Sequence, residues 1–417
     1  MSTIEEYPLQ KSGFTSVTFL RLSIALFLFS LLLPVTAEAI HDDSDPAEEE
    51  LAAWELFLQE VDTAGAAAPA QEATIPPPAL LRDESIRIFL FGGHTNNSLL
   101  SARKVPAAFL GVGAEAFVWQ TDGFHFFTVW ALAERRRFSS AEEDLEDEWT
   151  AALHLRYEHG LPLGAWTLEG GITATRQVYD AADTALPGEA AVDFLGVILP
   201  RASFSWKRLF GFGQELEWGF TSEHVLYQDI DYNNSLHGLR LQLRTPLAHG
   251  TSATVGGAVR DVHFEDEPPR SATGLPLSAE RLRFVRYDAD ILLQHERTWG
   301  PEHFWQLRFF GSWIPSNSSP WHGFDRRGWE FRGRSVLSPW RLHYRWSRAA
   351  VSYRARQGAP GVTAPLKQRR HTGVVGLEYN PGSWQLRGEL EYNRFFSNDP
   401  KSSYRARQVT ATLAKDF

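Results

Sequence analysis

The sequence predicts an all-β fold, a transmembrane antiparallel up-and-down β-barrel of about 16 strands, with about 14 as the next best count. Three observations predict it. Short segments alternate apolar and polar residues through most of the chain, the connections between them alternate in length, and aromatic residues reach 13% with 15 Trp. Trp and Tyr favour membrane–water interfaces. The mean hydropathy of −0.28 argues against a helical membrane protein and fits a barrel, because only every second strand residue meets lipid.

Residues 1–39 have the pattern of a signal peptide. Lys11 and Arg21 precede an apolar run over residues 22–35, and a small-x-small cleavage sequence follows at 37–39. The apolar run is shorter than the about 20 residues that a membrane-spanning helix needs, which makes an uncleaved signal anchor the weaker alternative. The chain has no Cys, which excludes a cysteine-linked lipid anchor, a disulfide framework and Cys-based metal sites. We therefore expect an exported protein.

Residues 40–84 form an acidic segment that we expect in the periplasm. Asp45 and Pro46 suit the N-cap and the first position of a helix over 45–62, whose apolar residues form a single stripe. A linker rich in Ala and Pro follows, stiffened by the prolines at 76–78. Two interpretations of the helix stay open: a tether that lies on a surface, or a helix that docks on a periplasmic partner or plugs the lumen.

The barrel domain is expected over residues 85–417, where helical periodicity gives way to period-two alternation. For example, Trp384, Leu386 and Leu390 alternate with charged and polar residues. Apolar faces recur on nearly every segment and no spare apolar element covers them, which disfavours a soluble β-sandwich or propeller. The expected strands are 85–92, 108–120, 124–136, 148–159, 165–178, 192–206, 212–226, 237–246, 251–263, 282–298, 304–314, 328–337, 341–356, 371–380, 383–395 and 404–417.

The connections between these segments alternate between long and short. Residues 179–191 and 264–281 are long connections, whereas 121–123 and the Asn-Pro-Gly sequence at 380–382 suit tight turns. An up-and-down barrel in the outer membrane has its short turns on the periplasmic side, and an even strand count leaves both ends of the barrel domain there. The alternation changes parity near 347–348, which predicts a β-bulge or a divided strand.

The last expected strand carries the most motif-like feature of the chain. Val409, Ala411, Leu413 and Phe417 fall on one face of it. This strand resembles the C-terminal signal strand of bacterial outer-membrane β-barrel proteins, the porin-like superfamily, and identifies no specific family. The resemblance implies the cell outer membrane of a Gram-negative bacterium, contact with outer-membrane lipid and lipopolysaccharide, and recognition by the barrel-assembly machinery. Lys415 departs from the pattern, in which an apolar residue is usual, and a Lys at the membrane edge can snorkel.

Charged residues alternate against the apolar face and are expected to line the lumen. A barrel of this size encloses an aqueous channel unless it is plugged, and rings of charge set ion preference. The net charge is −10, yet residues 281–417 are basic and the preceding segments acidic. This pattern predicts a channel for small polar or anionic solutes. The expected pore-lining residues are Arg240, Arg244, Arg260, Arg345, Arg354, Arg356, Arg387, Glu215, Glu217, Glu389 and Glu391.

A non-conducting barrel is the main alternative, because inward Arg and Glu can pair and simply hold the barrel's shape. It would act as a surface scaffold or as a component of an export or assembly machine reached through the 45–62 helix. An outer-membrane hydrolase is a minor alternative. His154 and His343 are expected inward, but no G-x-S-x-G, H-E-x-x-H or phosphate-binding Gly loop occurs. We expect no enzyme activity, cofactor or metal site, and no nucleic-acid binding, because the Arg residues alternate inward.

Overall fold

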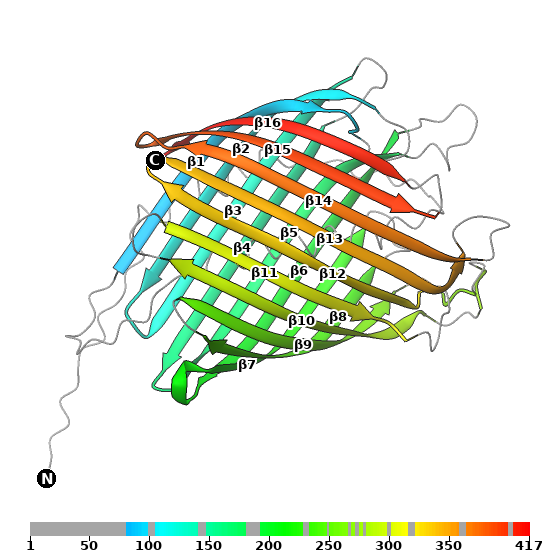
Figure 1. Cartoon of the computed structure of the whole chain (residues 1–417), viewed down its shortest axis with the longest axis horizontal. Coiled ribbons are helices and arrows are strands. Elements are labelled where there is room, and N and C mark those ends of the chain that lie inside the picture. Colours follow the sequence, from blue (N-terminus) through cyan, green and yellow to red (C-terminus); the bar gives the residue numbers. More distant parts are fainter. Residues whose placement is uncertain are drawn as a thin grey trace, which may run out of the picture.

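Sixteen antiparallel strands form a closed barrel in which β1 pairs with β16 (Figure 1). The computed structural model describes residues 81–98, 105–140, 147–180, 192–227, 233–247, 250–265, 268–271, 275–277, 281–297, 302–315, 322–357, 364–398 and 403–417. The strands are β1 (Leu81–Thr95), β2 (Ala107–Thr121), β3 (His125–Ser139), β4 (Glu148–Leu161), β5 (Gly164–Asp180), β6 (Val192–Leu209), β7 (Glu215–Tyr227), β8 (Asn234–Pro246), β9 (Thr251–Phe264), β10 (Arg283–Arg297), β11 (Glu302–Trp313), β12 (Phe324–Leu337), β13 (Trp340–Gln357), β14 (Pro365–Tyr379), β15 (Trp384–Ser397) and β16 (Tyr404–Asp416). A short 3-10 helix, η1 (Gly211–Gly213), separates β6 from β7.

Each of these strands lies where the alternation predicts one, so the all-β class, the up-and-down topology and the count of sixteen are confirmed. The boundaries differ by a few residues. β1 begins at Leu81, so the barrel extends into the expected linker, and β14 begins at Pro365, inside an expected loop. The expected signal peptide 1–39 and the helix 45–62 lie outside the described residues. Within the described ranges, no helix is long and apolar enough to cross a membrane.

The parity change expected near 347–348 is wrong. β13 keeps a constant register with β14 as far as Ser352, and the register shifts only between Ser352 and Gln357. Polar residues occur on both faces of β13 near 347–348, and this local pattern suggested a bulge that is not there. The irregularity of the strand lies close to its end.

The two ends of the barrel differ in the length of their connections. Turns of two to five residues join the strands at one end, the short-turn end, whereas every connection at the other, the long-loop end, has six or more. In the β2–β3 turn the Asp122 carboxylate accepts the backbone N–H groups of Phe124 and His125 at 3.0 and 2.7 Å. Gly382 of the expected Asn-Pro-Gly turn has a φ of 85°. β1 starts and β16 finishes at the short-turn end (Figure 1).

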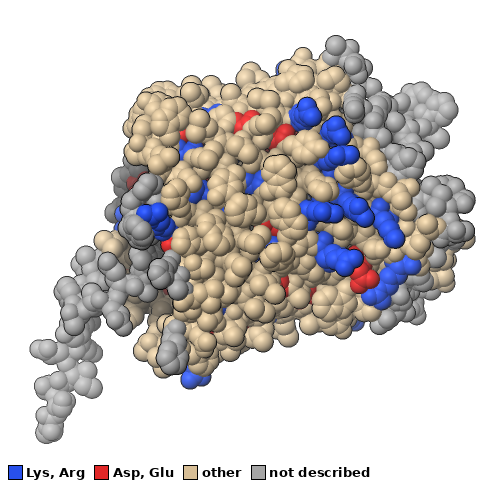
Figure 2. All heavy atoms as spheres, in the orientation of Figure 1, with Lys and Arg blue, Asp and Glu red and all other residues tan. Residues whose placement is uncertain are grey.

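The outward face of the sheet carries an apolar band. Leu386 and Leu390 on β15 lie opposite Leu413 and Val409 on β16, and the four side chains expose between 45% and 57% of their surface. Most of the outer surface in Figure 2 is free of Lys, Arg, Asp and Glu. Exposed apolar surface on strand after strand is what a barrel presents to lipid.

Aromatic residues border this band at the short-turn end. Trp340 packs on Tyr379 across β13 and β14 with ring centroids 4.7 Å apart. The ammonium group of Lys415 lies 5.3 Å from the ring centroid of Trp384 and 4.7 Å from that of Phe417. The lysine that departs from the signal-strand pattern is therefore held between two aromatic rings, where cation–π contact accommodates its charge at the edge of the apolar band.

Apolar clusters cover parts of the inner wall near the long-loop end. Phe91, Phe109 and Phe138 pack together across β1–β3, and the guanidinium of Arg136 lies 4.9 Å from the Phe109 ring centroid. A second cluster lies on β6–β10 and encloses Leu282, which is fully buried just before β10. The rest of the inner wall is left to polar and charged residues.

Candidate pore lining

Strand register decides which side chains point into the barrel. Arg341 on β13, Glu378 on β14 and Arg387 on β15 lie directly opposite one another in a single cross-strand row. Arg341 donates a hydrogen bond to Glu378 at 2.8 Å. The neighbouring positions Leu342 and Leu377 face outward and are exposed. Because side chains alternate between faces, this row and its equivalents on the other strands form the lining of the lumen.

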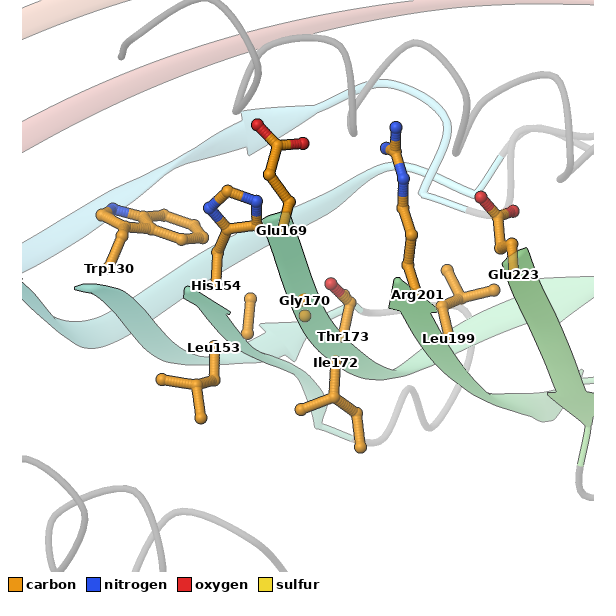
Figure 3. Close-up of a pocket in the computed structure, with 12 residues that line it drawn as sticks. Trp130, Leu153, His154, Glu169, Gly170, Ile172, Thr173, Leu199, Arg201 and Glu223 are labelled. Atoms are coloured by element: carbon orange, nitrogen blue, oxygen red, sulfur yellow. The ribbon is translucent and has the colours of Figure 1, made fainter. Parts of the chain in front are cut away.

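The same alternation is visible on the opposite side of the barrel. Figure 3 shows Glu169, Arg201 and Glu223 rising from one face of the sheet, while Leu153 and Ile172 extend from the other. Arg201 and Glu223 are directly paired positions on β6 and β7. The polar side of this view is the lumen and the apolar side is the outer band.

The inner wall from β2 to β7 is rich in carboxylates, and we call this set the acidic wall. Arg156 lies between two of them, 2.8 Å from Glu158 and 3.7 Å from Glu169. Ser203 donates to Glu169 at 3.1 Å. One arginine thus forms ion pairs with two carboxylates, so negative charge outnumbers positive charge at this place. The acidic wall consists of Glu115, Glu134, Glu148, Glu158, Glu169, Glu215, Glu217 and Glu223.

The inner wall from β8 to β13 has the opposite balance, and we call this set the basic wall. Arg260 and Arg286 are directly opposite each other and both contact Asp288, at 3.2 and 3.0 Å. Two arginines thus form ion pairs with one carboxylate. The basic wall consists of Arg240, Arg244, Arg260, Arg286, Arg308, Arg326, Arg332, Arg334, Arg341 and Arg345.

A second pair of inward arginines faces each other on β12 and β13. Arg332 and Arg345 are directly paired positions. Arg345 contacts Glu330 at 3.2 Å, and Arg332 donates to Gln306, a neutral side chain, at 2.6 Å. Like charges at paired positions repel each other, so positive charge is concentrated at this place of the inner wall.

Arg240 and Arg334 are the most available cations of the basic wall. Both side chains are exposed although they face the lumen. No described carboxylate forms an ion pair with either residue. Both charges therefore lie at the exposed surface of the inner wall.

The two walls face each other across the barrel. The hairpins β4–β5 and β12–β13 are eight strands apart in a ring of sixteen, so they are diametrically opposed. Glu158 and Arg334 each stand three residues before the end of their strand, and Glu169 and Arg345 each stand five residues after the start of theirs. Carboxylates therefore oppose guanidinium groups at equivalent distances from the short turns, which produces an electric field across the lumen.

Several inward charged side chains in the described part of the chain keep part of their surface exposed. The side chain of Arg244, near the short-turn end, is 48% exposed, and those of Arg260 and Arg156 keep 34% and 24% of their surface exposed. Charged side chains that face inward and still meet solvent are expected of an aqueous channel and not of a packed core.

Most of the residues expected to line the pore do face inward. His154 and His343 also do, and the His343 ring lies 3.0 Å from a Glu389 carboxylate oxygen. The inward members of the expected set are Arg240, Arg244, Arg260, Arg345, Arg387, Glu215, Glu217, Glu389 and Glu391.

Arg354 requires correction, because it stands on the outward parity of β13 together with the exposed Trp346. Arg356 lies beyond the register shift of β13, and its guanidinium carbon is 5.2 Å from the ring centroid of the inward Tyr353. Arg354 contacts Asp325 at 3.2 Å, and Asp325 is opposite the outward Ser352. The parity change assumed in the sequence placed Arg354 on the wrong face.

Sequence reasoning missed several lumenal charges. Arg334 lies between Gly333 and Ser335, so no apolar neighbours marked it as inward. Arg87, which contacts Asp416 at 2.7 Å, was missed because that contact exists only across the β1–β16 seam. The inward–outward alternation continues through Arg334 and Arg87. Assigning every second residue of each strand to the lumen would therefore have identified both.

The four positions of the expected assembly signal, Val409, Ala411, Leu413 and Phe417, share the outward face of β16. The Phe417 backbone N–H donates to the Ile86 carbonyl at 2.9 Å. Among the described residues, no group of three or more His, Asp or Glu is arranged to hold a metal ion.

No protein-family model and no curated protein sequence matches this chain. Among solved structures, it is similar to CdiB from Acinetobacter baumannii, with a TM-score of 0.44 and 10% identity over 79% of this chain and 60% of that one, less than two thirds of CdiB's length. OccAB1 from Acinetobacter baumannii has a TM-score of 0.42 and 11% identity over 81% of this chain and 96% of that one. OccK2 (OpdF) from Pseudomonas aeruginosa, solved with glucuronate, has a TM-score of 0.41 and 13% identity over 81% and 98%. These likenesses concern the general barrel shape, and no ligand is carried over from them.

Proposed function

We propose that this protein is an outer-membrane channel that passes small polar solutes and favours anions. The observation that carries the proposal is the exposed position of Arg240 and Arg334 in the lumen, with no described carboxylate paired to either. Unpaired lumenal cations raise the local concentration of anions, and the acidic wall opposite them orients a dipolar solute across the lumen. Phosphate, carboxylates and acidic sugars have the matching charge.

The outer-membrane location rests on the outer face of the barrel. Its apolar band, the aromatic border at the short-turn end and the short turns themselves suit a bacterial outer membrane with the long-loop end outside. In this orientation the residues before β1 start on the periplasmic side. Residues 45–62, which the sequence predicts to be helical, are then available to a periplasmic partner, and the last strand to the barrel-assembly machinery.

The second candidate is a non-conducting barrel that serves as a scaffold or as part of an export machine. The ion pairs that link Arg260 and Arg286 to Asp288, and Arg345 to Glu330, favour it, because they stabilise the wall without any solute. The exposed lumenal arginines favour the channel, since a purely structural network would leave no cation open to solvent.

Single-channel recording separates the two candidates. The purified protein, shown to be folded by its heat-modifiable migration on a gel, is added to a planar bilayer bathed in KCl. We expect discrete conductance steps, and a reversal potential under a salt gradient whose sign reports anion preference. Folded protein that produces no steps would overturn the channel and leave the scaffold, whereas steps that favour cations would overturn the anion preference.

A further inference from the structure

A group of cations lies outside the lumen, on the outward face of β12–β16 at the long-loop end. Figure 2 shows blue spheres gathered there, at the end of these strands away from the C-terminus, while the adjoining surface is largely uncharged. We call this set the outward basic patch. It consists of Arg327, Arg348, Arg354, Lys367, Arg369, Arg394, Arg405 and Arg407.

Four cations of the patch stand at the same height above the short-turn end. On four strands a patch cation is ten residues from an outward apolar or aromatic residue at the opposite edge: Leu337 and Arg327, Tyr379 and Arg369, Trp384 and Arg394, and Phe417 and Arg407. Ten strand residues span about 33 Å, or about 25 Å along the barrel axis at a tilt of about 40°. That height matches the apolar band of a transmembrane barrel, so the patch lies at the level of the lipid headgroups.

The core of the patch is a row of directly opposed side chains, three arginines and one histidine, in which Arg394 and Arg405 are adjacent like charges. Arg348 on β13 is paired with His371 on β14, which is paired with Arg394 on β15, which is paired with Arg405 on β16. Paired side chains have Cβ atoms about 5 Å apart, and like charges at such positions destabilise a sheet. Negative charge from another group would therefore stabilise this row.

The described part of the chain supplies little of that charge. Arg354 pairs with Asp325 at 3.2 Å, and Arg394 stacks on the Phe396 ring with its guanidinium carbon 3.9 Å from the centroid. No described carboxylate pairs with Arg348 or Arg405, and both side chains are exposed. The cations of the patch are therefore open to a ligand on the membrane side.

We propose that the outward basic patch binds the phosphate groups of a phosphorylated lipid of the outer leaflet, with lipopolysaccharide as the occupant. A guanidinium group binds phosphate oxygens through two parallel hydrogen bonds. Arginines on adjacent strands, about 5 Å apart, can hold one phosphate between them while the acyl chains lie along the apolar band below. A soluble anion would gain the charge contacts only, whereas a lipid satisfies the cations and the apolar surface together.

The proposal rests on the outer-membrane location and not on conduction. A barrel that carries no current leaves it intact, and failure of lipid binding leaves the channel intact. Arg240 and Arg334 face the lumen, so replacing them with Gln is expected to leave lipid binding unchanged.

The test measures lipopolysaccharide binding to the full barrel in a non-ionic detergent, by native mass spectrometry or microscale thermophoresis. The variant Arg348→Gln/Arg394→Gln/Arg405→Gln is expected to raise the Kd at least about tenfold. Enzymatic removal of the lipopolysaccharide phosphates should weaken binding to the wild type by a similar factor. The Arg→Lys variant at the same positions keeps the charge but loses the paired hydrogen bonds, and is expected to bind with intermediate affinity.

The matched control is Arg135→Gln/Arg137→Gln/Arg283→Gln. These cations also face outward at the long-loop end, but they have carboxylate partners: Asp147 for Arg135 and Arg137, and Asp261 for Arg283. The control removes the same charge and should change the Kd less than about twofold. Equal binding by the patch variant and the wild type, an equal loss in the control, or indifference to phosphate removal would each overturn the proposal. Displacement by millimolar inorganic phosphate would show a site for a free anion and overturn the lipid assignment.

Discussion

Replacing Arg240 and Arg334 with Gln removes two positive charges from the lumen. No described carboxylate is paired with either arginine, so the change leaves no buried anion without its partner and should leave the barrel folded. Gln keeps a similar length and polarity. Any change in ion preference can therefore be attributed to charge.

The expected size of the effect follows from the strand number. Sixteen strands about 4.8 Å apart and tilted by about 40° close to a radius of about 16 Å. An arginine that reaches about 6 Å inward holds its charge about 10 Å from the axis. At that distance each charge changes the energy of a monovalent ion by about 0.4 kcal/mol in water, and screening at about 0.1 M salt reduces this to about 0.15 kcal/mol. Together the two charges favour an anion over a cation by about 0.6 kcal/mol, or about threefold.

The assay is the reversal potential of reconstituted channels under a KCl gradient. We expect the double variant to lower the anion-to-cation permeability ratio about threefold near 0.1 M salt and to have almost no effect near 1 M, where the Debye length is about 3 Å. The control is Arg348→Gln/Arg394→Gln/Arg405→Gln, which removes charge from the outer face and should leave the ratio unchanged. An unchanged ratio at low salt, or the same shift at both salt concentrations, would refute the reasoning.

Three further predictions concern the barrel itself. Deleting residues 40–80 should leave a heat-modifiable barrel, since every described strand lies after them; loss of that gel shift would show that the segment is needed for folding. Gly111→Leu should cost about 1–3 kcal/mol in urea unfolding, because the new side chain meets the Phe91 ring, whereas Gly388→Ala, with nothing within 4 Å, should be neutral; equal effects would contradict the packing. Phe417→Ala should lower the yield of folded barrel in cells severalfold but leave refolding in detergent unchanged, because the side chain is 62% exposed; an equal loss in detergent would argue for a stability defect instead.

Strand positions could be predicted because the period-two pattern is local. Each strand needs one apolar face, and each tight turn needs a residue such as Gly382 that accepts a positive φ. Strand boundaries were harder to predict from the sequence, because a strand continues past its apolar stretch wherever the adjacent strand supplies backbone hydrogen-bond partners. β14 extends to Pro365 for this reason, against the far end of β13.

The pore lining was predictable only where the alternation was clean. Arg345 and Glu389 stand among apolar neighbours and were assigned to the lumen, whereas Arg334 stands among small ones and was not. Arg354 was assigned to the wrong face because one misjudged parity shift moves every later side chain of a strand.

The sequence by itself determined that the chain alternates, how many strands it has, and that the C-terminal half is basic. Only the tertiary structure decided where that charge lies, because cross-strand register joins residues far apart in the chain. It paired Arg87 with Asp416 across the seam, opposed the Glu158 hairpin to the Arg334 hairpin, and divided the basic residues between a lumenal wall and an outward patch. A shift of one residue along a strand moves a side chain from one face to the other. An arginine on the inner face meets the lumen, whereas an arginine on the outer face meets lipid.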